Sequence, residues 1–71
     1  MLHEPVHSSN VRSVGYSPVE HVLELAFHSG GLYRYQGVPA HVHADLMASP
    51  SKGRFVARFI KGHYVYQPIS S

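Results

Sequence analysis

The chain has 71 residues, of which 44% are hydrophobic and 14% are charged, and its formal net charge at pH 7 is +2. This length suits one domain with a small core, and the composition is too hydrophobic and too weakly charged for a disordered protein. The absence of cysteine excludes disulfides, thiolate nucleophiles and cysteine-ligated zinc. No apolar run approaches the roughly 20 residues that cross a bilayer, and the first residues do not resemble a secretory signal, so we expect a cytoplasmic protein.

Positive charge is concentrated in the last third of the chain. Residues 1–45 contain two basic and four acidic residues, a net charge of −2, whereas residues 46–71 contain four basic residues and no acidic one, a net charge of +4. Such a cluster of one sign predicts a surface that attracts polyanions. The four basic residues are Lys52, Arg54, Arg58 and Lys61.

Three segments in the first half of the chain are predicted to be strands. In the first segment, side chains alternate between two faces until Ser17-Pro18 introduces a turn. The second segment alternates apolar and polar residues more strictly. Ser29-Gly30-Gly31 is typical of a hairpin that leads into the third segment. We therefore expect a three-stranded antiparallel meander. Its strands would be residues 11–16, 21–28 and 32–36.

The pairing of the last two strands decides what the tyrosines in them do. A three-residue hairpin loop would place Phe27 opposite Tyr33 and Leu25 opposite Tyr35. Sliding the pairing by one residue would place Arg34 on the buried face, which is costly. We therefore expect both tyrosines on the core side. The alternative is that Tyr33 and Tyr35 are exposed and stack on nucleic-acid bases.

Two short helices are expected after the meander. Pro39 suits the first turn of a helix over residues 40–48, and a serine-proline step separates it from a second helix over residues 52–61, which Gly62 terminates. On a wheel of 100° per residue, the second helix has an apolar face opposite a basic one. A further short edge strand fits Tyr64–Tyr66, ended by Pro68.

The predicted fold is therefore α+β, with a three-stranded antiparallel sheet covered on one face by two helices. Its core would combine the inward-facing strand residues with the apolar sides of both helices. The predicted core residues are Val14, Tyr16, Leu23, Leu25, Phe27, Tyr35, Val38, Leu46, Phe55, Phe59 and Ile60.

A series of short motifs resembles a known family, the KTSC domain, which occurs at the C-terminus of some lysine–tRNA synthetases and as small free-standing bacterial proteins. The resemblance covers residues 8–66, between a mobile lead-in at residues 1–7 and a tail at residues 67–71. One departure is Val56, where the family usually carries asparagine. The motifs are Ser8-Ser9-Asn10-Val11, Gly15-Tyr16, Leu23, Leu25, Phe27, Gly30, Tyr33-Arg34-Tyr35, Val38-Pro39, Leu46, Ser51-Lys52-Gly53, Phe55, Ile60 and Tyr64. The resemblance implies a related fold and, since RNA binding has been suggested for the family, a nucleic-acid ligand.

The basic helix is the leading candidate for a functional surface. Arginine offers phosphate a bidentate fork and lysine offers it a point charge, so we expect Arg54, Arg58 and Lys61 to contact phosphates. Lys52 and the backbone amides around Gly53 would hold a further phosphate at the helix start. Four such contacts predict a log–log salt slope of about −2.8 on single strands. The alternative is a merely solvated face of an amphipathic helix.

Arg34 would extend this surface if it lies on the sheet face opposite the helices. Taken together, these residues predict a module that binds RNA, or another polyanion, through its phosphate backbone. The alternative function is a protein-interaction or self-association module that uses exposed strand edges, with a protein partner or a second copy of the chain.

Catalysis and metal binding are not expected. His41 and Asp45 would share a helix face, and His41 and His43 could chelate a metal on a strand, but the sequence places no third ligand for either pair. We therefore interpret the seven histidines as surface imidazoles. Their full protonation would raise the formal charge from +2 to +9. No nucleophile elbow, phosphate loop, zinc-protease helix motif or paired carboxylates occur, and a short chain leaves little room for a dry, supported pocket. We therefore expect no enzyme, no cofactor, no metal and no small-molecule substrate.

Overall fold

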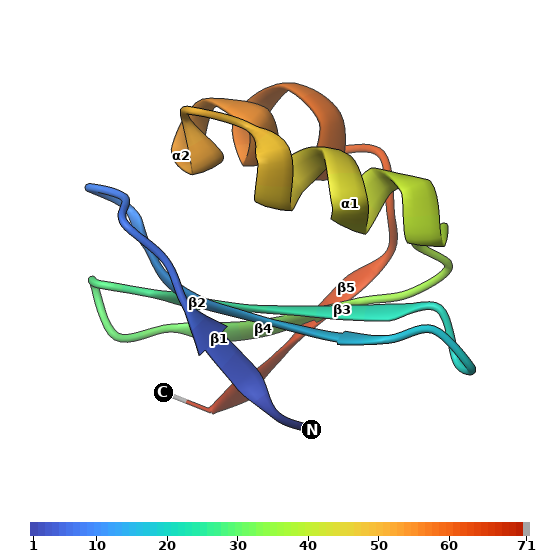
Figure 1. Cartoon of the computed structure of the whole chain (residues 1–71). Helices are drawn as coiled ribbons and strands as arrows, with labels where there is room; N and C mark the ends of the chain where they lie inside the picture. The colour runs from blue at the N-terminus through green and yellow to red at the C-terminus, as the bar shows by residue number, and fades with distance from the viewer. Residues whose placement is uncertain (71) are drawn as a thin grey trace.

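Five antiparallel strands and a short helical layer make up the fold in the computed structural model, which describes residues 1–70 (Figure 1). The strands lie side by side in chain order, and the helices cover one face of the sheet (Figure 1). The elements are β1 (His3–Pro5), β2 (Val11–Ser17), β3 (Val22–Phe27), β4 (Leu32–Tyr35), α1 (Ala40–Ala48), α2 (Lys52–Phe55), the π-helix η1 (Val56–Ile60) and β5 (Tyr66–Ser70).

The predicted α+β class, with an antiparallel sheet and two helical segments, is confirmed, but the prediction of three strands is wrong. The two additional strands are the sheet's edges. β1 pairs with β2, and it has only three residues, too few to show alternation. β5 pairs with β4 and contains Pro68, which the sequence analysis took as a strand end. An edge strand tolerates proline, because the backbone nitrogens on its outer side face solvent and need no partner strand. The added strands lie in segments that the sequence analysis placed largely outside the domain.

The hairpin between β3 and β4 differs in register from the prediction. Leu25 lies opposite Tyr33, whereas the predicted loop would have placed it opposite Tyr35. The loop comprises residues 28–30, because Gly30 adopts the positive φ of 111° that the turn requires. Since the shift is two residues, every side chain keeps its face, and both tyrosines lie on the side that faces the helices.

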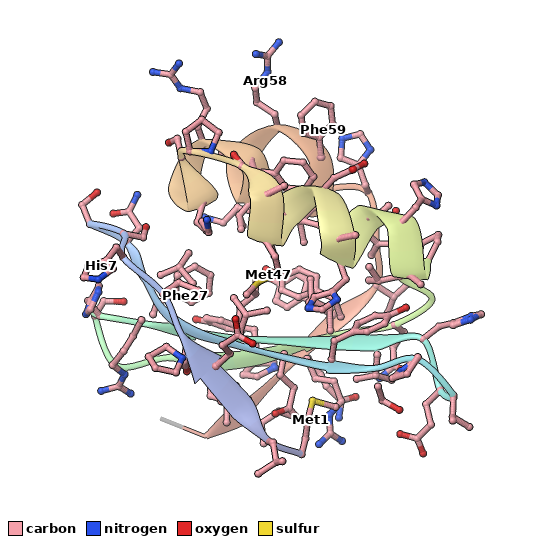
Figure 2. The ribbon with its side chains drawn as sticks, viewed as in Figure 1. Met1, His7, Phe27, Met47, Arg58 and Phe59 are labelled. Carbon is pink, nitrogen blue, oxygen red and sulfur yellow. The ribbon has the colours of Figure 1, made fainter. Side chains whose placement is uncertain are left out.

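The core fills the space between the helices and the sheet. Seven of the predicted core residues are buried there, and Tyr16, Phe27 and Phe55 pack against them half-buried. Figure 2 shows Phe27 and Met47 in this space. The sequence analysis missed Val11 and Val56, which are also buried. The full cluster is Val11, Val14, Leu23, Leu25, Tyr35, Val38, Leu46, Val56 and Ile60.

Phe59 was predicted to be in the core, and this prediction is wrong. The Lys61 N–H donates to the carbonyl oxygen of Val56 at 2.9 Å, five residues back, so the last turn is a π-helix and the 100° wheel fails there. The wider turn directs Val56 and Ile60 toward the sheet. Phe59 is 51% exposed and points away from the sheet beside Arg58 (Figure 2).

Helix α1 is fixed to β2 at its first turns. The Tyr16 hydroxyl donates to the Val38 carbonyl at 2.6 Å, and the Tyr16 ring stacks on His43 with ring centroids 4.5 Å apart. Burial raises the pKa of Tyr16 and lowers that of His43, and so disfavours the charged form of both groups. Within residues 1–70, no helix combines the length and apolar character needed to span a membrane.

Candidate nucleic-acid interface

The outer side of α2 and η1 presents two arginines next to aromatic rings. We call Arg54, Phe55, Arg58 and Phe59 the basic–aromatic surface. Both arginines are exposed and form no ion pair with any residue that the structure describes. The Arg58 guanidinium lies 5.9 Å from the centroid of the Phe59 ring, which is itself 4.9 Å from Phe55. Free guanidinium groups suit phosphate oxygens, and an exposed ring suits an unpaired base.

Lys61 lies apart from the two arginines, although the helical wheel placed all three together. The chain leaves the π-helix at this residue, whose backbone is extended, with φ −64° and ψ 128°. Its ammonium lies 5.8 Å from the centroid of the Phe27 ring, on the side of the helices that faces the sheet. Lys61 is exposed and, within residues 1–70, makes no ion pair. It is therefore a separate cation near the sheet.

Lys52 and Gly53 have local structural partners. The Lys52 ammonium donates to the carbonyl oxygens of Met47 and Ser49 at 3.0 and 2.7 Å, and so satisfies acceptors at the end of α1. Gly53 packs against the side chain of Asn10. The structure therefore does not bring these two residues to the basic–aromatic surface.

Arg34 lies on the sheet face away from the helices, as the sequence analysis required, but its charge is occupied. Its Nε and Nη2 donate to Oε2 of Glu24 at 3.0 and 2.7 Å. Glu24 is only 5% exposed, and the two residues are direct cross-strand neighbours on β3 and β4. Arg34 therefore neutralises a buried carboxylate and does not extend the basic–aromatic surface.

A second partner of Glu24 attaches β1 to the sheet. His3 Nε2 donates to Glu24 Oε1 at 2.8 Å, which leaves Nδ1 to accept from the Ser13 hydroxyl at 2.9 Å. Gly15 makes room for the imidazole, since a Cβ there would lie 2.7 Å from the ring. Burial would raise the pKa of Glu24, but the hydrogen bonds from His3 and Arg34 outweigh it and hold the pKa below its ordinary value.

This polar network was not predicted from the sequence, because Glu24 occupies an outward position in a regular alternation. The only signal was a carboxylate flanked by leucines in the strand next to Arg34. In the tertiary structure, the network joins His3 to Ser13, which is 10 positions later in the chain, and to Glu24, which is 21 positions later.

The histidines mostly serve local structure. His28 and His63 donate from Nε2 to the backbone carbonyl oxygens of Ser8 and Arg58, at 3.0 and 2.9 Å. His43 stacks on an aromatic ring, as described above. Among residues 1–70, no group of three His, Asp or Glu side chains is placed to hold a metal ion.

A pocket of about 790 Å³ opens between the β3–β4 hairpin, the segment before β2, and the end of the helical layer. Both tyrosines singled out in the sequence line it, with Tyr35 only 3% exposed and Tyr33 half-buried. The lining residues are Ser9, Asn10, Phe27, His28, Ser29, Tyr33, Tyr35, Gly53, Val56, Lys61, Gly62 and Tyr66.

Aromatic rings from three strands meet in this pocket. The Tyr33 ring lies 5.6 Å from Phe27 and 5.8 Å from Tyr66, in both cases edge to face. Tyr35 lies 5.5 Å from Tyr66, and burial raises the pKa of its hydroxyl. Tyr35 is too buried to offer a ring face to a base, whereas Tyr33 is partly accessible and Tyr66, which the sequence analysis did not consider for this role, is 56% exposed.

Fold and site together define a small α+β domain with a cationic helical surface and an aromatic pocket. The model of the KTSC domain matches residues 7–64, and the chain belongs to the KTSC domain family. It superimposes on the crystal structure of a KTSC domain protein from Yersinia pestis with a TM-score of 0.95 and 40% identity, covering 97% of both chains.

Relatives of two sizes share this domain. A protein from Tsukamurella paurometabola is 43% identical over 86% of this chain and 91% of its own, and an uncharacterized protein from Stutzerimonas stutzeri is 44% identical over 86% and 87%. A lysine–tRNA ligase from Nostoc is 39% identical over 87% of this chain, but the match spans only 11% of the ligase. The domain therefore occurs both nearly alone and as a small part of a large enzyme.

Proposed function

We propose that this KTSC domain is an RNA-binding module that contacts the phosphate backbone through Arg54 and Arg58, with Lys61 as a third contact. The observation that carries the proposal is the exposure of Arg58 beside the exposed Phe59 ring, 5.9 Å from guanidinium to centroid. The Phe59 ring is exposed to water and is not buried in the core, and it lies next to arginines that form no ion pair with the described residues. This arrangement suits a surface that stacks on bases and binds phosphates.

Single-stranded RNA is the form that this surface suits best. Stacking needs an unpaired base, and double-stranded RNA hides its bases. The relatives among lysine–tRNA ligases support an RNA ligand, because those enzymes act on a tRNA by their name. With three cations and no dedicated base reader on the helices, the affinity would be weak and sensitive to salt.

Association through strand edges is less favoured. β1 offers an edge of three residues, and the β5 edge carries Pro68, and both features limit pairing with another strand. Deleting residues 64–71 would not test this alternative cleanly, because Tyr66 packs on Tyr33 and Tyr35. Sedimentation of the intact chain is the suitable test, and a monomer at high concentration would exclude self-association.

The proposal is tested by fluorescence anisotropy with a short single-stranded RNA at several salt concentrations. Three phosphate contacts give a log–log slope of about −2.1, and one contact gives about −0.7. We expect the first value for the wild type and the second for Arg54→Ala/Arg58→Ala.

The matched control is Arg12→Glu, which lowers the net charge by two, as the double variant does, at an exposed position of β2 outside the basic–aromatic surface. It is expected to keep the wild-type slope. A wild-type slope near zero, or an equal loss in the control, would refute the proposed surface.

A further inference from the structure

We propose that the aromatic pocket holds one unpaired nucleotide, with its base against Tyr33 and Tyr66 and its phosphate at Lys61. The proposal rests on the proposed function, since it names the unit of RNA that the domain would hold. The pocket lies on the sheet side of the helical layer, so it is a site distinct from the basic–aromatic surface.

The ring geometry favours a planar aromatic ligand. Tyr33 and Tyr66 lie on adjacent strands with their centroids 5.8 Å apart and their planes at 76°, so they form a corner and not a stack. Tyr66 is 56% exposed, although its neighbour Tyr35 is buried. A base can stack on one ring of such a corner and meet the edge of the other.

The polar groups of the pocket suit the edge of a base. The Asn10 side chain is exposed and makes no hydrogen bond within residues 1–70, so its amide offers both donor and acceptor. It rests on Gly53, where a Cβ would lie 2.8 Å from Nδ2. The glycine therefore lets the amide approach the helix closely, at the wall of the pocket.

The charge of the pocket favours an anion. Lys61 is the only lysine or arginine among the described residues that line it, and no carboxylate lines it. The ammonium lies over Phe27, next to the aromatic corner. The volume of about 790 Å³ lies within the range of about 300–1,000 Å³ typical of small-ligand sites. Aromatic walls, a free amide and one cation correspond to the base and phosphate of a nucleotide.

The test is an NMR titration of the full chain with adenosine 5′-monophosphate and, separately, uridine 5′-monophosphate, with inorganic phosphate as the comparison. We expect saturable shifts at Asn10, Gly62 and Tyr66 with either nucleotide at millimolar concentration, and much smaller shifts with phosphate. Tyr66→Val removes the ring but keeps a strand-forming residue, and it should weaken nucleotide binding about tenfold.

Asn10→Asp is the second variant, because an exposed side chain of nearly the same shape is not expected to affect folding. It places a carboxylate in the pocket and should weaken nucleotide binding severalfold by repelling the phosphate. Arg12→Gln removes a cation outside the pocket and should bind as the wild type does. Binding that is unchanged in both Tyr66→Val and Asn10→Asp would overturn the pocket proposal.

The outcomes also separate the two proposals. No saturable shifts at the pocket, with RNA binding that still depends on Arg54 and Arg58, would overturn the nucleotide site and leave the proposed function standing. Nucleotide shifts at the pocket, with an RNA salt slope of only about −0.7 that Arg54→Ala/Arg58→Ala leaves unchanged, would support the site and refute the phosphate contacts of the two arginines.

Discussion

Replacing Glu24 with glutamine tests whether the buried polar network holds the sheet together. The carboxylate accepts three hydrogen bonds, one from His3 and two from Arg34, and is almost fully buried. Glutamine has nearly the same shape, but it carries one acceptor oxygen and a donor NH₂ group. Its oxygen can accept from Arg34, but its NH₂ group can meet His3 only if the imidazole proton moves from Nε2 to Nδ1, so both partners lose a charged acceptor.

The cost follows from the weakening of these hydrogen bonds when their acceptor loses its charge. A hydrogen bond to a charged group contributes about 1.5–3 kcal/mol, and the Arg34 side chain is 38% exposed, so water offsets part of its loss. We therefore expect Glu24→Gln to lower the free energy of unfolding by about 2 kcal/mol. For a domain of this size, that corresponds to a fall of about 8–16 °C in the midpoint of thermal unfolding.

Thermal unfolding followed by circular dichroism measures this effect, with Glu20→Gln as the control. Glu20 is exposed, and its side chain makes no hydrogen bond within residues 1–70, so the control should change stability by less than about 0.5 kcal/mol. Equal midpoints for Glu24→Gln and the wild type at neutral pH would refute the reasoning.

The pH dependence gives an independent check. Because the pKa of Glu24 is lowered in the folded protein, its contribution is complete above the ordinary carboxyl pKa of about 4.3 and is lost as the pH falls through the folded value. The gap between wild type and Glu24→Gln should therefore be full at neutral pH and shrink under acid. A gap that persists unchanged at low pH would contradict the assignment.

Four further substitutions test the helical layer. Lys52→Met should lower the thermal midpoint, because it removes the ammonium that caps α1. It should leave the salt slope for RNA at about −2.1, and a slope smaller in magnitude by about 0.7 would show that Lys52 contacts a phosphate instead. In urea denaturation, Phe59→Ala should cost less than about 1 kcal/mol and Ile60→Ala about 2–5 kcal/mol, and the reverse order would contradict the π-helix. Gly53→Ala should keep or raise the thermal midpoint, because alanine favours a helix by about 1 kcal/mol relative to glycine. It should weaken nucleotide binding, because the added Cβ displaces the Asn10 side chain. Wild-type nucleotide affinity in this variant would contradict a role of Asn10 in the pocket.

The sequence by itself determined the features that follow from local periodicity. Alternation with a period of two assigned Leu25, Tyr33 and Tyr35 to the core side, and this held although the hairpin register was off by two residues, because an even shift preserves the face. The spacing of the motifs was enough to indicate the family. The cluster of basic residues without acidic neighbours was equally visible in the sequence.

Only the tertiary structure decided which of those basic residues are free. Lys52 and Arg34 are cations in sequence, but one caps α1 and the other pairs with Glu24, and no local pattern specifies such partners. The π-helix exposes Phe59 because i→i+5 hydrogen bonding, as between Val56 and Lys61, breaks the period on which the helical wheel depends.

β1, the true extent of β5 and the pocket were also beyond local reasoning. β1 is too short to show a period, and the short edge strand expected at Tyr64–Tyr66 instead runs from Tyr66 through Pro68 along β4. The pocket joins Asn10, Tyr33, Gly53 and Tyr66, which come from four separate parts of the chain. Contacts of this kind depend on how the strands pair and how the helices fold back over them, so they arise only when the whole chain is folded.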